Sequence, residues 1–351
     1  MNITNKVKIL CEDGCEQSIW CKQLLGGLQK ELKKRRISYE QLTNGEQILP
    51  RDSVCVIGIN NAWTEERVRQ CNQKGCVPIV LSNQSRRKVQ GQYHLVCADI
   101  RSAVSKLQEA FGAAGRKRIA LYGANYEADA EKDRTESFAR LIGDPSDIYR
   151  NTGNLETCFR SFKPKAALYD AVVCTNGYAA ISLVKKLEKE MPELLEDLLI
   201  LSCEEVLRHS KYNRWISLID LDLESYGSTA LAVLEMAAMR EEISVITIRM
   251  NARVCDIPEK RSNAALVSEE TEAYADPEII SMEKIEQLLR DADDMDHHII
   301  AMLLDHAKYS DIADSCYMTE GNVKYRVKKY MSICDCRTRK ELEELLKEYL
   351  Q

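Results

Sequence analysis

Short apolar runs alternate with amphipathic stretches along the first 250 residues, and this alternation limits the possible folds more than any other feature. The apolar runs occupy residues 7–11, 53–59, 76–81, 171–174 and 198–202. The segments between them have helical periodicity; at 19–35, for example, Trp20, Leu24 and Leu28 recur at every fourth position. Strands that are apolar on both faces are typical of parallel sheets covered by helices on both sides.

The alternation runs through two successive units, which predicts two lobes built on doubly wound parallel α/β sheets. We expect a two-lobed unit over 1–257, with a first lobe of about 6–98 and 223–242 and a second of about 99–222 and 243–257. Residues 258–281 are mostly polar, without an apolar period, and are expected to form a linker. Residues 282–351 return to a helical period, which predicts a connecting helix and a small all-α domain.

Charge and cysteine usage exclude several classes of protein. Because the chain has a net charge of -6, the protein as a whole does not attract nucleic acid, and any such contact must be confined to a local basic surface. The 14 cysteines are irregularly spaced and many lie in apolar runs, which favours buried thiols in a reducing cytosol over disulfides or a metal site. We expect no signal peptide and no membrane span, because the first residues lead directly into a strand and no apolar run is long enough to cross a bilayer. The sequence therefore predicts a soluble cytoplasmic protein without a metal or cofactor.

Polar side chains gather where the predicted strands end. Ligands of doubly wound sheets bind at the carboxyl ends of the strands, and two lobes can close on a ligand by a hinge motion. Short amides, carboxylates and one aromatic ring suit a polar neutral ligand such as a sugar. Such residues are also common turn formers, and that alternative stays open for each of them. The candidates are Glu12, Asp13, Asn60, Asn61, Asn125, Tyr126, Asn176, Glu204 and Asp222.

Residues 6 to about 256 resemble the effector-binding domain of the lactose/galactose-repressor (LacI/GalR) family, which has the type 1 periplasmic-binding-protein fold. The resemblance rests on the segment Asp133-Arg134-Thr135-Glu136-Ser137-Phe138 and on short motifs at later strand ends. It implies that Arg134 contacts an effector, and that Asn176, Glu204 and Asp222 occupy matching positions. Gly177 and Leu221 stand where the family has polar residues. That family places its DNA-binding helices before this domain, whereas the small all-α domain predicted here follows it.

Near the C-terminus, two short helical patterns are joined by a turn. In the second, roughly 320–331, Val323, Val327 and Tyr330 are spaced to face inward. From Thr319 to Lys340 there are seven basic residues and two acidic ones. The residues expected to face outward are Lys324, Tyr325, Arg326, Lys328 and Lys329. A helix with one apolar seam and one basic face fits the major groove of DNA, although a solvated basic helix of an ordinary bundle has the same pattern.

About the last 55 residues resemble the LuxR-type helix-turn-helix. The resemblance is carried by Asp311-Ile312-Ala313, by Gly321-Asn322-Val323-Lys324, and by Arg337-Thr338-Arg339-Lys340-Glu341-Leu342. It implies that Lys324, Tyr325 and Lys328 face the DNA groove. The full set of candidate DNA-contacting residues is Thr319, Asn322, Lys324, Tyr325 and Lys328.

Together these features predict a ligand-responsive DNA-binding transcription regulator that works as a homodimer, because paired half-sites suit a dimer. The predicted partners are operator DNA and a small polar effector. One alternative is a binding module whose C-terminal helices contact a protein, which the acidic segment 341–348 keeps open. A second alternative is an enzyme on the same scaffold. The nucleotide-binding and nucleophile motifs of such enzymes are missing from the sequence, so we expect no catalytic residues.

Overall fold

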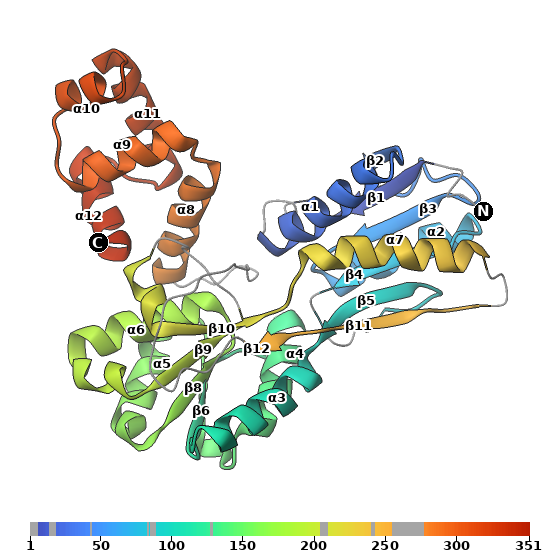
Figure 1. Cartoon of the computed structure of the whole chain (residues 1–351), viewed down its shortest axis with the longest axis horizontal. Helices are drawn as coiled ribbons and strands as arrows, with labels where there is room; N and C mark the ends of the chain where they lie inside the picture. The colour runs from blue at the N-terminus through green and yellow to red at the C-terminus, as the bar shows by residue number, and fades with distance from the viewer. Residues whose placement is uncertain are drawn as a thin grey trace.

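In the computed structural model the chain forms two α/β lobes and a C-terminal group of helices (Figure 1). The structure describes residues 6–13, 19–42, 44–82, 84, 89–126, 129–203, 210–239, 243–254 and 277–351. Within these residues, no helix combines the length and the hydropathy needed to span a membrane. The two parallel-sheet lobes followed by helices confirm the predicted fold class.

The first lobe is built on a six-stranded parallel sheet. Its order is β11-β5-β4-β3-β1-β2. The strands are β1 (Val7–Cys11), β2 (Tyr39–Leu42), β3 (Ser53–Ile57), β4 (Ile79–Ser82), β5 (His94–Asp99) and β11 (Thr247–Asn251). Its helices are α1 (Ile19–Lys34), α2 (Asn61–Gln73) and α7 (Glu224–Met239). Strands β1 and β4 are buried along their whole length, as expected for a sheet covered on both faces.

The second lobe repeats this plan with the order β12-β10-β9-β8-β6-β7, in which only β12 is antiparallel to its neighbour. Its strands are β6 (Ile119–Ala124), β7 (Ile148–Arg150), β8 (Ala171–Cys174), β9 (Leu199–Ser202), β10 (Ile216–Asp220) and β12 (Arg253–Val254). Its helices are α3 (Ile100–Ala113), α4 (Asp129–Phe138), α5 (Leu155–Phe162) and α6 (Gly177–Glu190). Strand β7 and helix α5 were not predicted, because three and eight residues are too short to establish a period.

The chain crosses between the lobes late in the sequence, and here the structure differs from the prediction. We placed residues 243–257 in the second lobe. Strand β11 instead pairs with β5 at the edge of the first sheet, from Thr247↔Leu95 to Asn251↔Asp99. Only β12 joins the second sheet, through Asp220↔Arg253. Period and hydropathy show that a strand is present but do not specify its partner, so an edge strand can be assigned to the wrong lobe.

Helices α1 and α7 approach each other closely because each has a glycine at the crossing. A Cβ atom on Gly27 would lie 2.1 Å from the backbone oxygen of Glu224. A Cβ atom on Gly227 would lie 2.0 Å from the backbone nitrogen of Leu28. The two backbones are therefore in direct contact, and any larger residue would force the helices apart.

The C-terminal helices are α8 (Pro277–Asp291), α9 (Asp294–Leu304), α10 (Tyr309–Ser315), α11 (Glu320–Ile333) and α12 (Arg339–Leu350). Residues 277–281, which we placed in the linker, are the first residues of α8, since proline is well tolerated at the first position of a helix. The linker prediction for 258–276 lies outside the described residues. The helices pack around Ile299, Leu303, Val323, Val327 and Leu346, all of which are buried.

Candidate effector site and candidate nucleic-acid interface

At the strand ends of the first lobe, Glu12 and Asn60 lie together. The Glu12 carboxylate follows β1 and accepts hydrogen bonds from the backbone N–H groups of Ile59 (2.7 Å) and Asn60 (3.0 Å). The Asn60 side chain caps α2 by accepting from Ala62 N at 2.8 Å. Asp13 is exposed beside them. The structure therefore brings two of the predicted residues together, and both hold the loop between β3 and α2 in place.

At the strand ends of the second lobe, Glu131, Arg134 and Asn176 form a buried polar cluster. Glu131 and Arg134 lie one turn apart on α4, and Arg134 Nη2 donates to Glu131 Oε1 at 3.1 Å. The Asn176 amide donates to the same oxygen at 3.3 Å, while its carbonyl oxygen caps α6 by accepting from Ala179 N at 2.8 Å. Arg134 and Asn176 are 2% and 1% exposed, so two predicted residues meet inside the protein.

Glu131 is the member of this cluster that sequence reasoning missed. Its side chain is fully buried, and Oε2 has no hydrogen-bond partner. Burial raises the pKa of Glu131 above its ordinary value, and this effect outweighs the opposing influence of Arg134 and Asn176. The signal that would have found it is the i, i+3 spacing of Glu131 and Arg134, which places an acid and a base on one helix face.

Tyr126 follows β6 and is exposed. The guanidinium of Arg150, the last residue of β7, lies 5.0 Å from the centre of its ring. The neighbouring Asn125 is fixed to α4, since the Thr135 hydroxyl donates to the Asn125 carbonyl oxygen at 3.1 Å. These contacts hold the end of β6 beside the Glu131 cluster.

Asp222 lies where the chain passes from β10 to α7. Its φ of 48° is in the left-handed region. Its carboxylate accepts from the Ser225 hydroxyl at 2.8 Å and forms an ion pair with Arg253 of β12. Asp222 thus joins two of the segments that connect the lobes. Glu204, which the sequence also proposed, lies outside the described residues.

Helices α10 and α11 are joined by residues 316–319 and pack through apolar faces. Ile312 and Ala313 of α10 and Val323, Val327 and Tyr330 of α11 are buried. Thr319 caps α11, with its hydroxyl oxygen accepting from Asn322 N at 3.3 Å. The two helices therefore meet through one buried apolar seam across a short connection.

The opposite face of α11 is polar and exposed. Tyr325 is 75% exposed, and Asn322, Lys324 and Lys328 are also exposed. Lys324 forms an i, i+4 ion pair with Glu320 at 2.8 Å. Four of the five predicted contact residues therefore lie on one accessible helix face, and the fifth, Thr319, caps that helix.

Arg326 does not point outward as predicted. It forms ion pairs with Asp293 and Asp296, which make a capping box at the start of α9. The Tyr330 hydroxyl donates to the same Asp296 carboxylate. Burial alone would raise the pKa of Asp296, but Tyr330 and Arg326 outweigh it and hold the pKa below its ordinary value. Arg326 thus fixes α11 to α9, which charge counting along the sequence does not reveal.

The acidic segment 341–348 is helical and engaged within the chain. Glu341 accepts from Arg337 N at 2.7 Å, and Glu343 pairs with Arg339 at 2.5 Å. Glu348 pairs with Lys185 of the second lobe at 2.6 Å. These contacts place three carboxylates of the segment in intramolecular roles.

No protein-family model matches the chain, and no curated protein matches it in sequence. Solved structures match it in fold. A transcriptional regulator CelR–cellobiose complex matches with a TM-score of 0.54 and 12% identity over 70% of this chain and 81% of its own. A LacI-family transcriptional regulator, CCPA from Weissella paramesenteroides with bound sucrose, matches with a TM-score of 0.51 and 12% identity. The match covers 71% of this chain and 96% of that regulator. GanP, a glucose-galactose binding protein from Geobacillus stearothermophilus, matches with a TM-score of 0.52 and 15% identity. The match covers 72% of this chain and 99% of GanP.

These identities are low, so the likeness concerns the fold. The chain has the two-lobed parallel α/β architecture of LacI-family regulators and of a sugar-binding protein, as the resemblance of residues 6 to about 256 implies.

Proposed function

We propose that this protein is a ligand-responsive DNA-binding transcription regulator that works as a homodimer. A small polar effector binds at the strand ends between the two lobes, and α11 of the C-terminal helix-turn-helix, which is of the LuxR type, reads DNA. The observation that carries the proposal is the combination of a two-lobed fold with a packed helix pair that exposes Lys324, Tyr325 and Lys328.

The effector site is centred on Arg134 and Asn176, with Tyr126 and Asp222 at its border. Arg134 Nη2 already has a partner within the protein, since it lies 3.1 Å from Glu131 Oε1. Hydroxyl-rich neutral molecules suit a site of amides, one guanidinium and one carboxyl. Three structural neighbours carry cellobiose or sucrose or are described as binding glucose and galactose, which supports a sugar as the effector class.

DNA binding rests on the exposed face of α11. Lysine side chains there are suited to contact phosphates or the acceptor groups of guanine, and Tyr325 and Asn322 can reach base edges or phosphates. The proposed contact surface is limited to one face of one helix, so it is compatible with a net charge of -6 for the whole chain. The rest of the molecule is not expected to attract nucleic acid.

The test is a selection of duplexes from a random-sequence library by the full chain, followed by gel retardation. The Lys324→Ala plus Lys328→Ala variant is expected to lose retardation of the selected duplex and to keep its thermal unfolding midpoint. The slope of log K against log salt should also fall by roughly 0.9 for each phosphate contact removed. Lys33→Ala plus Lys34→Ala removes the same charge from an exposed part of α1 and should bind like the unmodified chain. Undiminished retardation by the α11 variant would contradict the assignment.

A second candidate is a protein-contacting module, and one observation favours it. Tyr317, in the turn before α11, is 98% exposed, and Tyr325 is 75% exposed. Exposed tyrosines are common in protein interfaces. Failure to enrich any duplex, together with loss of a protein partner on Tyr317→Ala, would favour this candidate over DNA binding.

A further inference from the structure

The C-terminal helices share a hydrophobic core with the second lobe. One continuous cluster of buried residues contains Phe162 and Ile181 of α5 and α6 together with Ile279 of α8 and Leu346 of α12. Within the described residues, this cluster includes none from the first sheet. In Figure 1 the helical group lies on the side of the second lobe, and α8 and α12 are its members nearest to α6. The helical group is therefore built onto the second lobe.

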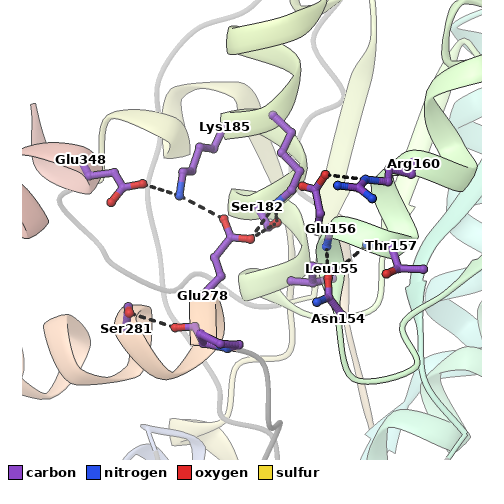
Figure 2. Close-up of polar contacts among 12 residues, drawn as sticks. Asn154, Leu155, Glu156, Thr157, Arg160, Ser182, Lys185, Glu278, Ser281 and Glu348 are labelled. Atoms are coloured by element: carbon purple, nitrogen blue, oxygen red, sulfur yellow. Dashed lines mark hydrogen bonds and ion pairs between the residues drawn. The ribbon is translucent and has the colours of Figure 1, made fainter.

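A polar network at the same contact fixes the position of α8. Figure 2 shows the Glu278 carboxylate reaching from α8 to α6. Lys186 Nζ lies 2.5 Å from Glu278 Oε2, the Ser182 hydroxyl donates to that oxygen at 3.0 Å, and Lys185 Nζ lies 3.2 Å from Oε1. Lys186 is 8% exposed and Ser182 is fully buried. Because these charged groups are largely removed from water, each needs its partners close by, and the partners are in reach in only one relative position of α6 and α8.

The network continues to the last turn of α12. Lys185 also pairs with Glu348 at 2.6 Å and donates to the Tyr349 hydroxyl at 3.1 Å (Figure 2 shows Lys185 between Glu278 and Glu348). Beside it, the Ser210 hydroxyl donates to the Tyr349 backbone oxygen at 2.8 Å. The two ends of the helical group, α8 and α12, thus meet on one face of α6, where Ser182, Lys185 and Lys186 are spaced i, i+3 and i+4.

The other end of α6 lies in the proposed effector site. Asn176 caps the helix and bonds Glu131, the partner of Arg134. From Asn176 to Lys186 is ten residues, or about 15 Å along a helix. One uninterrupted helix therefore has the candidate ligand contacts at its start and the anchor of the helical group at its middle.

We propose that α6 transmits occupancy of the effector site to the DNA-binding helices, and that Ser182, Lys185, Lys186 and Glu278 are positioning residues that make those helices move with the second lobe. This inference rests on the proposed function, because it assigns the regulation of the same two sites. Effector binding at Asn176 that favours one arrangement of α6 then favours one position of α8 and α12. By reciprocity, DNA binding that favours this position changes the affinity of the effector site for its ligand.

Hydrogen–deuterium exchange of the full chain, without DNA or sugar, tests the link. Glu278→Lys places a third cation against Lys185 and Lys186, and it is expected to speed exchange in α8 and α12 about tenfold or more. The same variant should also speed exchange in the first turn of α6, at residues 178–180. Asn176→Ala, at the other end, should speed exchange in α8 and α12.

Two further variants control the result. Lys186→Glu combined with Glu278→Lys restores opposite charges and should return exchange toward that of the unmodified chain. Glu190→Lys alters the exposed end of α6, where Glu190 pairs with Lys163 of the second lobe, and should leave α8 and α12 unchanged. If Glu278→Lys unfolds the whole chain, the milder Glu278→Gln is judged by the same criteria.

The proposal is overturned if loosening of α8 and α12 leaves the first turn of α6 unaffected, or if Asn176→Ala leaves α8 and α12 unaffected. The outcome is independent of whether the chain binds DNA. A chain that enriches no duplex would contradict the proposed function, and the exchange result would still decide whether α6 couples its two ends.

Discussion

Lys186 of α6 and Glu278 of α8 are separated by 92 residues in the sequence, yet their charged atoms lie 2.5 Å apart. This pair joins the α/β lobes to the C-terminal helices. The buried Ser182 hydroxyl donates to Glu278 and accepts from Lys186. These directional hydrogen bonds fix the relative orientation of the two side chains, in addition to the attraction between their charges. If the C-terminal helices bind DNA as proposed, such a contact is what makes them follow the movement of the second lobe.

The helical group is expected to lose stability in acid. Burial alone would raise the pKa of Glu278, but the nearby Lys186 and Lys185 outweigh it and hold the pKa below its ordinary value. The pKa of Asp296 is lowered in the same way. A carboxyl whose folded-state pKa is depressed adds stability that is fully present above its unfolded pKa, near 4.5 for Glu278, and is lost as pH falls through the folded value. Thermal unfolding between pH 7 and pH 3 should show a decreasing midpoint, with a shallower decrease for Glu278→Gln.

The exposed Glu190 provides the control for this measurement. Its pKa is also lowered, mainly by a hydrogen bond from Lys163, but it lies at the surface and should contribute little. An equal reduction of the pH dependence in Glu190→Gln and Glu278→Gln would contradict the special role of the buried carboxylate.

Adjacent glycines of α1 should respond in opposite directions. Gly27→Ala would drive a methyl group into the backbone of α7 and is expected to destabilise the fold by about 1–3 kcal/mol. Gly26→Ala meets nothing within 4 Å and should stabilise it by roughly 0.5–1 kcal/mol, because alanine favours the helix over glycine. Chemical denaturation of both variants measures the difference. Similar effects at the two positions would show that α1 and α7 are not in direct contact.

Asp296 is expected to be critical for the packing of α11 against α9. Asp296→Ala removes the acceptor of the Tyr330 hydroxyl and a partner of Arg326, and it weakens the capping box of α9. The combined loss should be about 2–4 kcal/mol. Asp294→Ala, at an exposed position of the same first turn, should change stability by less than about 0.5 kcal/mol. Comparison of the two by denaturation, followed by gel retardation at a temperature where Asp296→Ala is partly unfolded, should show a loss of DNA binding for Asp296→Ala alone.

Arg134 is expected to be required for effector binding. A panel of mono- and disaccharides should contain at least one that raises the unfolding temperature of the unmodified chain, because a ligand that binds only the folded state stabilises it. Arg134→Ala should abolish that shift. Arg140→Ala, an exposed arginine just beyond α4, should retain it. Full retention of the shift by Arg134→Ala would place the effector elsewhere.

The sequence was sufficient for the parts of the fold that local patterns determine. Buried parallel strands such as Ala171–Cys174 were predicted to the residue, since an apolar run of that length between turn residues has few alternatives. The pairing of strands was harder to predict, because the neighbours of a strand depend on contacts between residues far apart in the sequence. For this reason β11 was predicted in the second lobe, although it pairs with β5 of the first. The same reason explains Arg326, whose charge indicated exposure but whose partners come from α9.

The candidate site was only partly predictable. Arg134 was proposed from a family resemblance, and Asn176 from its place at a strand end as well as from that resemblance. The structure brings them together through Glu131, which no motif indicated. Glu12 and Asn60 were also proposed, and they meet in a loop-positioning contact. The sequence thus indicates the end of the sheet where polar residues gather, while the division of roles among them depends on hydrogen bonds formed in the folded chain.

The most direct test is the dissociation constant of the full chain for its selected duplex, measured at fixed salt with and without the sugar that gives the largest thermal shift. The proposed function predicts that saturating sugar changes this constant by about fivefold or more, the usual lower range of coupling between two sites. An unchanged dissociation constant, with the sugar shown to be bound, would contradict it.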